Sequence, residues 1–548
     1  MSTVIYNGKI YVKRETFAQA LIIDGGRILK TGASADILDL APKGAEKIDA
    51  HGALVLPAFH DSHLHLMWVG RRASGIDCVN CASIEDAISR GRETIARIKP
   101  PAGAWIQGAG LNPDRFSAGE KRDLSREDMD KISADNPLII SRHCGHTIYC
   151  NTAALKLAGI SESAPDIPGG TIEKDANGRP TGVLRENANA LIRRRIPAPS
   201  ADDMKGYLRL AMKKAQSLGI SACGSYDTDG HDFDTVCGAY RDIFDEAREA
   251  GRPLLRVSMQ CGISARDDIL DAHLRRHAAN GRPLWHDPQW GTFLKIQSVK
   301  LFADGTLGGS TAWMRQPYRD NPLTSGFPVL DQDTLNHFVQ KAAEGGAQAL
   351  IHAIGDAGID STLQAFERVT APGKNPLRHG IIHCQISSPE LLERMARNKI
   401  LALVQPAFLA DDMHILESRV GHELASTSYA WGSMRRMNIA VSYGTDAPVS
   451  PVDPLYSIEW AVLRRDSENS AGSAFNPGEC VDVYSAIDAY TEGAAFSSFD
   501  ENLMGRIQPG AYADLVFLDR DICALPPEGI RSARVLRTMC AGLTVYEV

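Results

Sequence analysis

The sequence predicts an α/β protein built on an eight-stranded parallel barrel, the (β/α)8 or TIM barrel, with further β-strands at both ends of the chain. Through the middle of the chain, short apolar runs alternate with helical patterns such as 204–219 and 334–346. Such alternation is typical of a parallel sheet covered by helices. The runs are Leu56–Leu66, 218–227, 254–262, 296–305, 347–356, 380–385, 400–406 and 439–446. Eight is the number of strands that this barrel requires.

The two ends of the chain read as short β-strands. Near the N-terminus the candidate strands lie within 3–12, 20–32 and 46–56, and Asp24-Gly25-Gly26 is a hairpin turn signal between alternating apolar residues. Near the C-terminus they lie within 512–519 and 535–548. We therefore assign residues 1–57 and 501–548 to a separate β-rich part and residues 58–500 to the barrel.

One interval between barrel strands is too long for a single βα unit. About 160 residues separate the first and second candidate strands, whereas a crossover connection needs only a dozen residues upward. We predict an inserted subdomain over about 72–200.

Composition excludes several classes of protein. The chain has 548 residues, of which 44% are hydrophobic and 23% charged, with a formal net charge of −8. This balance gives no electrostatic case for nucleic acid or an anionic membrane as a partner, so we expect a small-molecule substrate. The N-terminus lacks the apolar core of a signal peptide, and we expect no membrane span.

The cysteines favour a reducing compartment. Eleven cysteines are scattered along the chain, which fits reduced thiols and a cytoplasmic location better than a disulfide framework. Cys78 and Cys81 have CxxC spacing, but a structural zinc site requires a second such pair and the sequence has none. We interpret this pair as structural.

Polar side chains that could bind a metal fall at the ends of the candidate barrel strands, where the functional face of such a barrel lies. In strand order they are His63 and His65, Lys300, His352, His383 and Asp446. Each of these residues also has an alternative explanation that involves no metal. A single buried histidine is usually a hydrogen-bonded core residue, and Asp446 could be a turn residue. Lysine, however, is rarely buried unless paired, and the set as a whole favours a metal site.

These residues and their order resemble the amidohydrolase superfamily of metal-dependent hydrolases. That pattern is HxH on strand one, lysine on strand four, histidines on strands five and six, and aspartate on strand eight. More narrowly, the chain resembles the amidohydrolase-3 group, which includes the N-substituted formamide deformylases. The resemblance is carried by VKLFADGTLGGSTA (299–312), HAIGDAG (352–358), RHGIIHCQ (378–385), VQP (404–406), GTDAPV (444–449) and PTGVLRE (180–186).

The resemblance implies a β-sandwich made from both termini, which agrees with the β-rich ends. It also implies two metal ions, which we expect to be zinc, bridged by a carbamylated Lys300. One ion would be held by His63, His65 and Asp446, and the other by His352 and His383. The alternative is a single metal, with Lys300 as an uncarbamylated hydrogen-bond donor. A homodimer is expected from the family alone.

Two segments depart from the family pattern. Pro57-Ala58-Phe59 stands before the strand-one motif, with an extra histidine, His60, that has no assigned role. His143-Cys144-Gly145-His146 stands where the family tends to have Asp-Gly-His. His146 matches the family histidine that contacts the substrate, and His143, like Trp68 and Trp313, is a candidate substrate contact. His143, His146, Trp68 and Trp313 could instead be packing residues.

The chemistry expected is hydrolysis of a carbon–nitrogen bond by a metal-activated hydroxide. Asp446 would be the general acid and base, and His352 and His146 are further catalytic candidates. Asp61 is expected to orient a ligand histidine rather than to bind metal. Hydrolysis of a carboxylic ester or lactone on the same site is the alternative. A non-catalytic scaffold is disfavoured because all six ligand positions are present.

Overall fold

A computed structural model of the chain describes residues 2–116, 121–142, 146–165, 167–228, 231–252, 255–278, 285–287, 289–466 and 472–548. The chain divides into two compact units. Unit 1 comprises Met1–Leu66 and Met212–Val548, and unit 2 comprises Met67–Ala211. His143, a predicted substrate contact, and its neighbour Cys144 lie outside the described residues.

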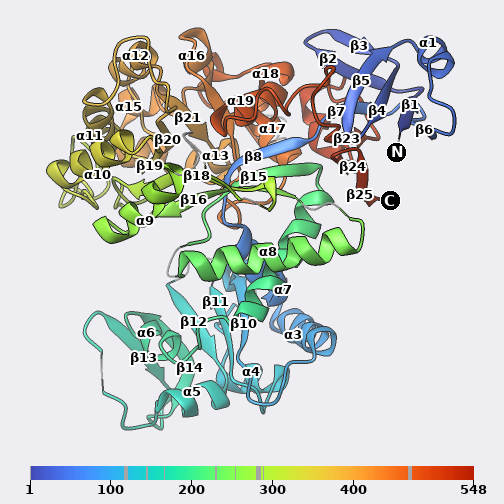
Figure 1. The fold of residues 1–548 in the computed structure, drawn as a ribbon. Helices are drawn as coiled ribbons and strands as arrows, with labels where there is room; N and C mark the ends of the chain where they lie inside the picture. The colour runs from blue at the N-terminus through green and yellow to red at the C-terminus, as the bar shows by residue number, and fades with distance from the viewer. Residues whose placement is uncertain are drawn as a thin grey trace. The chain divides into compact units, whose positions relative to one another are not determined.

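Eight parallel strands form the barrel of unit 1 (Figure 1). In sheet order they are β8 (Phe59–Leu64), β15 (Ile220–Ser225), β16 (Arg256–Gly262), β18 (Gly291–Phe302), β19 (Gln348–Ala353), β20 (Gly380–His383), β21 (Leu401–Val404) and β22 (Val441–Tyr443). Asp446 N–H donates to His63 O at 2.7 Å, and His65 N–H donates to Ala447 O at 2.8 Å, so the sheet nearly closes on itself. The predicted barrel and its eight strands are confirmed.

The barrel strands are largely buried because both of their faces are covered. Every residue of β15, β19, β20 and β21 is buried, as is typical of parallel strands packed between a barrel interior and surrounding helices. The short strand β17 (Trp285–Asp287), which the sequence did not predict, pairs antiparallel with β18.

Helices lie between the barrel strands and, further along the chain, after the last of them. The longer ones are α8 (Phe233–Glu249), α9 (Asp267–Ala278), α10 (Gln332–Glu344), α11 (Asp356–Glu367), α12 (Pro389–Asn398), α17 (Pro454–Leu463) and α18 (Val483–Tyr490). The shorter ones are α13 (Leu409–Asp412), α14 (Leu416–Val420), α15 (His422–Ser426), α16 (Trp431–Arg436) and α19 (Glu492–Ser497), with 3-10 turns η2 (Pro406–Phe408), η3 (Pro477–Glu479) and η4 (Pro527–Ser532). Several begin at a side-chain cap: Asp331, for example, accepts from Thr334 N–H at the start of α10.

The two ends of the chain build a β-sandwich beside the barrel strands in unit 1. One sheet has the order β5 (Arg27–Gly32), β4 (Ala20–Asp24), β1 (Thr3–Tyr6), β6 (Glu46–Asp49), and helix α1 (Ser34–Asp39) follows β5. The other has the order β25 (Leu543–Glu547), β24 (Val535–Cys540), β23 (Leu515–Leu518), β7 (Leu54–Pro57), β2 (Lys9–Lys13), β3 (Thr16–Ala18). Ile5 and Leu21 from the first sheet share one core with Val55 and Leu515 from the second. The predicted sandwich is therefore confirmed.

The predicted hairpin is also present in the first sheet. Strands β4 and β5 are antiparallel, with Asp24 opposite Arg27. Gly25 and Gly26 between them have φ of +54° and +78°, the left-handed conformation that two-residue hairpin turns require and that glycine adopts without strain.

Unit 2 is the insertion after the first barrel strand. Its sheet has the order β13 (Gly170–Lys174), β14 (Pro180–Glu186), β12 (Thr147–Cys150), β11 (Leu138–Arg142), β10 (Ile106–Leu111), β9 (Ile76–Asp77). Its helices are α2 (Leu66–Ser74), α3 (Ile84–Ile98), η1 (Pro113–Arg115), α4 (Arg126–Ile132), α5 (Thr152–Ala158), α6 (Asn189–Arg193) and α7 (Ala201–Gln216). Neighbours on one strand serve opposite faces, as period two requires: Ile140 and Ile139 belong to different core clusters.

None of the helices within the described ranges is long and apolar enough to cross a membrane.

Candidate metal centre

The candidate ligands lie at the carboxyl ends of the barrel strands. His63 is the penultimate residue of β8, Lys300 lies near the end of β18, and His383 is the last residue of β20. His352 is the penultimate residue of β19, His65 directly follows β8, and Asp446 follows β22 by three residues.

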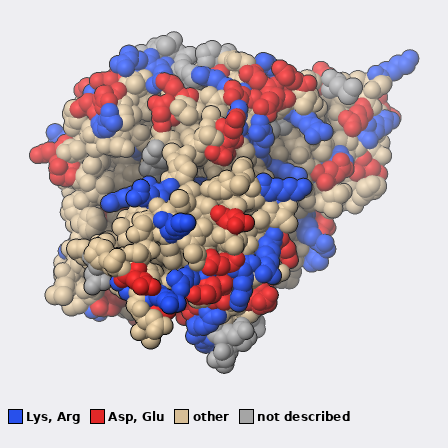
Figure 2. Space-filling model, turned by 90° about the horizontal axis from the view of Figure 1, so that it is seen from below, with Lys and Arg blue, Asp and Glu red and all other residues tan. Residues whose placement is uncertain are grey.

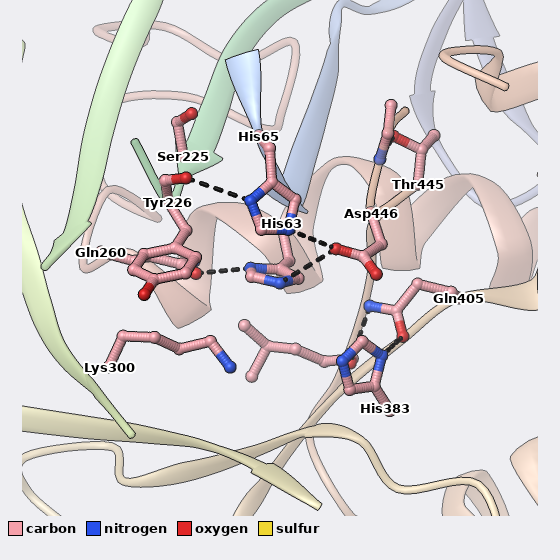
Figure 3. A network of polar contacts seen from close by, with 12 residues as sticks. His63, His65, Ser225, Tyr226, Gln260, Lys300, His383, Gln405, Thr445 and Asp446 are labelled. Carbon is pink, nitrogen blue, oxygen red and sulfur yellow. Dashed lines mark hydrogen bonds and ion pairs between the residues drawn. The ribbon is translucent and has the colours of Figure 1, made fainter. Parts of the chain in front are cut away.

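Three of these residues converge on one point (Figure 3). Oδ1 of Asp446 lies 3.2 Å from Nε2 of His63 and 3.0 Å from Nε2 of His65. One ligand atom from each residue lies within 4.8 Å of the other two. Two imidazole nitrogens and a carboxylate oxygen form a donor set that suits zinc and related divalent metals.

The hydrogen bonds behind the two histidines determine which ring nitrogens face this point. Nδ1 of His63 donates to Oε1 of Gln260 at 2.6 Å, and Gln260 is itself oriented because its Nε2 donates to Ser62 O at 2.8 Å. Nδ1 of His65 donates to Tyr226 O at 3.1 Å. In neutral rings both Nε2 atoms are therefore acceptors, and they face an acceptor carboxylate oxygen.

Three acceptors this close repel one another unless a cation or proton lies between them. Burial lowers the pKa of His63, against the opposing effect of Asp446, and so disfavours a proton on that ring. Burial also disfavours the charge of Asp446, but the close contacts with the rings of His63 and His65 hold its pKa well below the usual range. The residues thus fit a divalent cation.

His352 and His383 form a second pair of buried imidazoles, with ring centroids 4.4 Å apart. Nδ1 of His383 donates to Oε1 of Gln405 at 2.8 Å, and Nε2 of His352 donates to Gly305 O at 2.9 Å. Each ring keeps one lone pair on its other nitrogen. Burial lowers the pKa of His352 to about 3, so this ring is neutral near pH 7.

The ring of His383 links the two groups of histidines. Its centroid lies 5.9 Å from that of His63, and the ring is stacked on Phe408 at 5.7 Å with an interplanar angle of 15°.

Lys300 is buried beside these rings. Its Nζ lies 4.1 Å from the ring centroid of Phe302 and 6.0 Å from that of Tyr226. Within the described ranges, no carboxylate lies within 4.0 Å of this amine. Burial lowers the pKa of Lys300 to about 7, against the opposing effects of Asp446 and Asp304. A substantial fraction of the amine is therefore neutral near pH 7.

Asp304 holds the loop that positions His352. Its carboxylate accepts three backbone hydrogen bonds, from Trp313 at 2.9 Å, Ile354 at 3.0 Å and Gly355 at 2.7 Å. Burial nevertheless raises the pKa of Asp304 to about 7. The next residue is Gly305, whose carbonyl accepts the hydrogen bond from His352.

Among the described residues, the Asp61 carboxylate makes no hydrogen bond to an imidazole ring, contrary to the expectation that it orients one. Its carboxylate accepts from the hydroxyl of Thr445 at 2.6 Å and from the backbone N–H of His63 at 3.2 Å. It therefore joins the backbone of the first barrel strand to that of the last. Gly444 lies in the same contact, where a Cβ would come within 2.6 Å of His63 N.

Two of the candidate ligands have backbone conformations that are uncommon for residues other than glycine. His383 has a φ of +75° and Asp446 a φ of +52°. Such conformations concentrate at functional sites, where the surrounding structure holds them.

The remaining predicted contacts are distributed over both units. Trp313 lies on the loop after β18, and its backbone is bound to Asp304. Trp68 lies on α2 and is 40% exposed. His146 belongs to unit 2, where Nδ1 interacts with Glu186 Oε2 at 2.9 Å beside a cavity of about 550 Å³ that is also lined by Asn189, Arg193 and Arg194. His60 is buried, and neither of its ring nitrogens has a hydrogen-bond partner within the described ranges.

Two residues of the centre were missed by sequence reasoning. Gln260 and Gln405 orient His63 and His383, yet each stands in an apolar run as an unremarkable amide. The sequence feature that could have indicated them is a glutamine within an apolar run, near the end of a predicted barrel strand.

The chain is similar to known hydrolases along almost its whole length. The profile of the amidohydrolase family matches residues 46–546. YtcJ of Bacillus subtilis, named as an amidohydrolase, is 33% identical over 100% of both chains. The N-substituted formamide deformylase of Arthrobacter pascens is 25% identical, over 97% of this chain and 96% of that protein.

A solved structure is similar as well. An uncharacterized metal-dependent hydrolase from Pyrococcus furiosus superposes with a TM-score of 0.75 at 29% identity, covering 95% of this chain and 100% of that one. The family match covers almost the whole chain, and the chain has a nearly closed eight-stranded barrel with a cluster of metal-competent residues at its strand ends. The chain therefore belongs to the amidohydrolase family and is a hydrolase.

Proposed function

We propose that this hydrolase cleaves a carbon–nitrogen bond in an amide, an N-substituted formamide or a cyclic amide. The observation that carries the proposal is the convergence of His63, His65 and Asp446 at the functional face of the barrel. The bond class is supported by the name of one relative, an N-substituted formamide deformylase.

The donor atoms support zinc as the metal, with two ions per chain. His63, His65 and Asp446 would hold one ion, and His352 and His383 the other. A carbamylated Lys300 would bridge them, because a carbamate supplies oxygen ligands whereas an ammonium has no lone pair. The burial of Lys300 away from any described carboxylate partner supports this assignment. A single ion with an unmodified Lys300 is the alternative.

The bound metal would lower the pKa of a water molecule towards about 7 and polarise the substrate carbonyl. Asp446 would move the proton. Its Oδ1 contacts both histidines, while Oδ2 makes no hydrogen bond to any described residue. Oδ2 can therefore accept a proton from the attacking water and deliver it to the leaving nitrogen, which leaves poorly unless protonated. His352 and His146 are proposed to assist at the oxyanion.

Aromatic rings beside the centre support a substrate with an apolar leaving group. The ring of Phe302 lies 5.2 Å from that of His352, and the ring of Tyr226 lies 5.4 Å from that of His65. Trp68, Trp313 and His143 are proposed as further substrate contacts.

A small-molecule substrate in the cytoplasm is part of the same proposal, with a homodimer expected from the family. In Figure 2, basic and acidic side chains are interspersed among uncharged residues. This pattern favours no polyanionic partner on that face.

The acid–base assignment is tested with Asp446→Asn. The variant should retain metal, measured by elemental analysis, and lose turnover by about 10²–10⁴-fold, the usual contribution of general acid–base catalysis. Asp39→Asn on α1, an exposed position, is the matched control and should leave turnover unchanged. A variant Asp446→Asn with near-wild-type turnover would show the assignment to be wrong.

The bond class is tested separately with a panel of aryl and alkyl N-acyl amines, formamides, cyclic amides, esters and lactones, each assayed with and without chelator. Chelator-sensitive turnover of amides above esters is expected. Turnover confined to esters or lactones would replace the proposed bond class with the alternative.

A further inference from the structure

Cys78 and Cys81 of unit 2 take no part in the proposed hydrolytic chemistry. Cys78 directly follows β9, and Cys81 stands two residues before Ser83, the N-cap of α3. The N–H of Cys81 donates to the carbonyl of Cys78 at 3.2 Å, so the two cysteines are the first and last residues of one turn. The end Cα atoms of such a turn lie within about 7 Å, and a disulfide needs a Cα separation of about 4.4–6.8 Å.

Several contacts hold this turn in place. The N–H of Cys78 donates to Ala109 O at 2.9 Å, and the N–H of Val79 donates to Oδ1 of Asp77 at 3.1 Å. Arg90, which projects from α3, donates to Val79 O at 2.9 Å. These hydrogen bonds hold the turn, and with it the two cysteines, in place.

The two thiols differ from the other cysteines in their surroundings. A hydrogen bond from Cys78 lowers the pKa of Cys81, with burial opposing and Arg90 assisting, and the same bond raises the pKa of Cys78. Burial raises the pKa of the remaining described thiols: Cys150, Cys223, Cys237, Cys261, Cys384, Cys480, Cys523 and Cys540. Cys81 is thus the described cysteine best placed to react as a thiolate.

The pair lies just beneath the surface of unit 2. Cys78 and Cys81 are 0% and 2% exposed, but Asp77, Asn80 and Ala82, which flank or separate them, are exposed. A small reagent would reach the two sulfurs through local opening of this turn.

We propose that Cys78 and Cys81 form a reversible intramolecular disulfide by exchange with a low-molecular-mass disulfide such as oxidised glutathione. The thiolate of Cys81 attacks one sulfur of that disulfide, which forms a mixed disulfide and releases one glutathione thiolate. Cys78 then loses its proton, and its sulfur attacks the sulfur of Cys81 and releases the second glutathione as a thiolate. Two protein thiols are oxidised, and one disulfide is reduced to two thiols.

The test uses the intact metal-loaded protein, equilibrated with glutathione buffers of decreasing reducing strength, quenched with acid, unfolded and alkylated. Peptide mass spectrometry should show a 78–81 disulfide under oxidising buffer, its loss with dithiothreitol, and alkylation of the eight other described cysteines throughout. Full alkylation of both Cys78 and Cys81 in every buffer would overturn the proposal, as would a stable glutathione adduct in the wild-type protein.

Two single variants test the order of the steps. Cys78→Ser should trap glutathione on Cys81, and Cys81→Ser should leave Cys78 without an adduct over the same time. Cys237→Ser, a buried cysteine on α8, is the control and should retain the 78–81 disulfide. The opposite reactivity in the two variants would overturn the assignment of Cys81 as the attacking group, and circular dichroism checks that each variant is folded.

Discussion

The amide oxygen of Gln260 accepts a hydrogen bond from Nδ1 of His63 at 2.6 Å. This contact places the Nε2 lone pair of His63 towards Asp446. Gln260→Leu should weaken metal binding about 10–100-fold, the usual cost of losing a partner that orients a metal ligand. Gln260→Glu keeps an acceptor at this position and should recover much of the affinity. Isothermal titration of the apoprotein with zinc measures both, and equal losses in both variants would contradict an orienting role.

Asp304 should affect the second pair of histidines. Asp304→Asn replaces one of two acceptor oxygens with an NH₂ group that faces backbone N–H donors, so the loop that carries Gly305 should shift away from His352. We expect loss of one metal equivalent and a lower kcat, with the equivalent at His63 and His65 retained. Elemental analysis together with kinetics checks this, and an unchanged metal content would contradict it.

Gly444 should tolerate no side chain. A Cβ there would lie 2.6 Å from N and 2.8 Å from O of His63, and backbone atoms cannot move aside cheaply. Gly444→Ala should therefore lower both thermal stability and metal content. Gly238→Ala is the matched control on α8, where a Cβ has nothing within 4 Å. It should be neutral or stabilising by about 0.5–1 kcal/mol, so similar destabilisation of both variants would refute the steric explanation.

The raised pKa of Asp488 predicts that the stability of the folded protein depends on pH. Burial, with Glu492 assisting, raises its pKa from 3.8 to about 6. The folded protein thus holds this proton more tightly than the unfolded chain, so ionisation costs stability as pH rises from about 4 to about 6. Asp488→Asn keeps an acceptor for the Tyr11 hydroxyl, which lies 3.0 Å from Oδ1.

The variant should lose less stability over this pH range and exceed the wild type by on the order of 1 kcal/mol at pH 7. Near pH 3.5 the two should agree most closely. Urea unfolding across pH 3.5–7.5 measures the difference, and parallel curves would contradict the assigned cause.

The barrel was predictable because its signal is local. Each barrel strand is a short apolar run bounded by polar residues, and His63-x-His65 and Lys300 are conspicuous within such runs. The insertion was visible only as an over-long interval, and we expected it over about 72–200, whereas unit 2 spans Met67–Ala211. Its boundaries fall within helices α2 and α7, where composition does not change.

The orienting contacts were not predictable because their partners are distant in sequence. Gln260 and His63 are 197 positions apart, and neither run reveals the other. None of the predicted ligands lies at the end of the seventh barrel strand, β21. Gln405 there binds Nδ1 of His383 rather than a metal. Asp61 was expected to orient a ligand ring, but its partners are backbone groups and the hydroxyl of Thr445, whose position depends on how the first and last strands meet.

The central claim is a metal centre at the carboxyl ends of the barrel strands. It is tested most directly by counting the metal ions in protein purified without chelator. Native mass spectrometry of the same protein detects carbamylated Lys300, and hydrolysis is assayed before and after metal removal. The account predicts two equivalents of zinc per chain, added CO₂ on Lys300, and loss of hydrolysis that returns with zinc. Protein that binds no divalent metal and hydrolyses its substrate equally well with chelator present would contradict it.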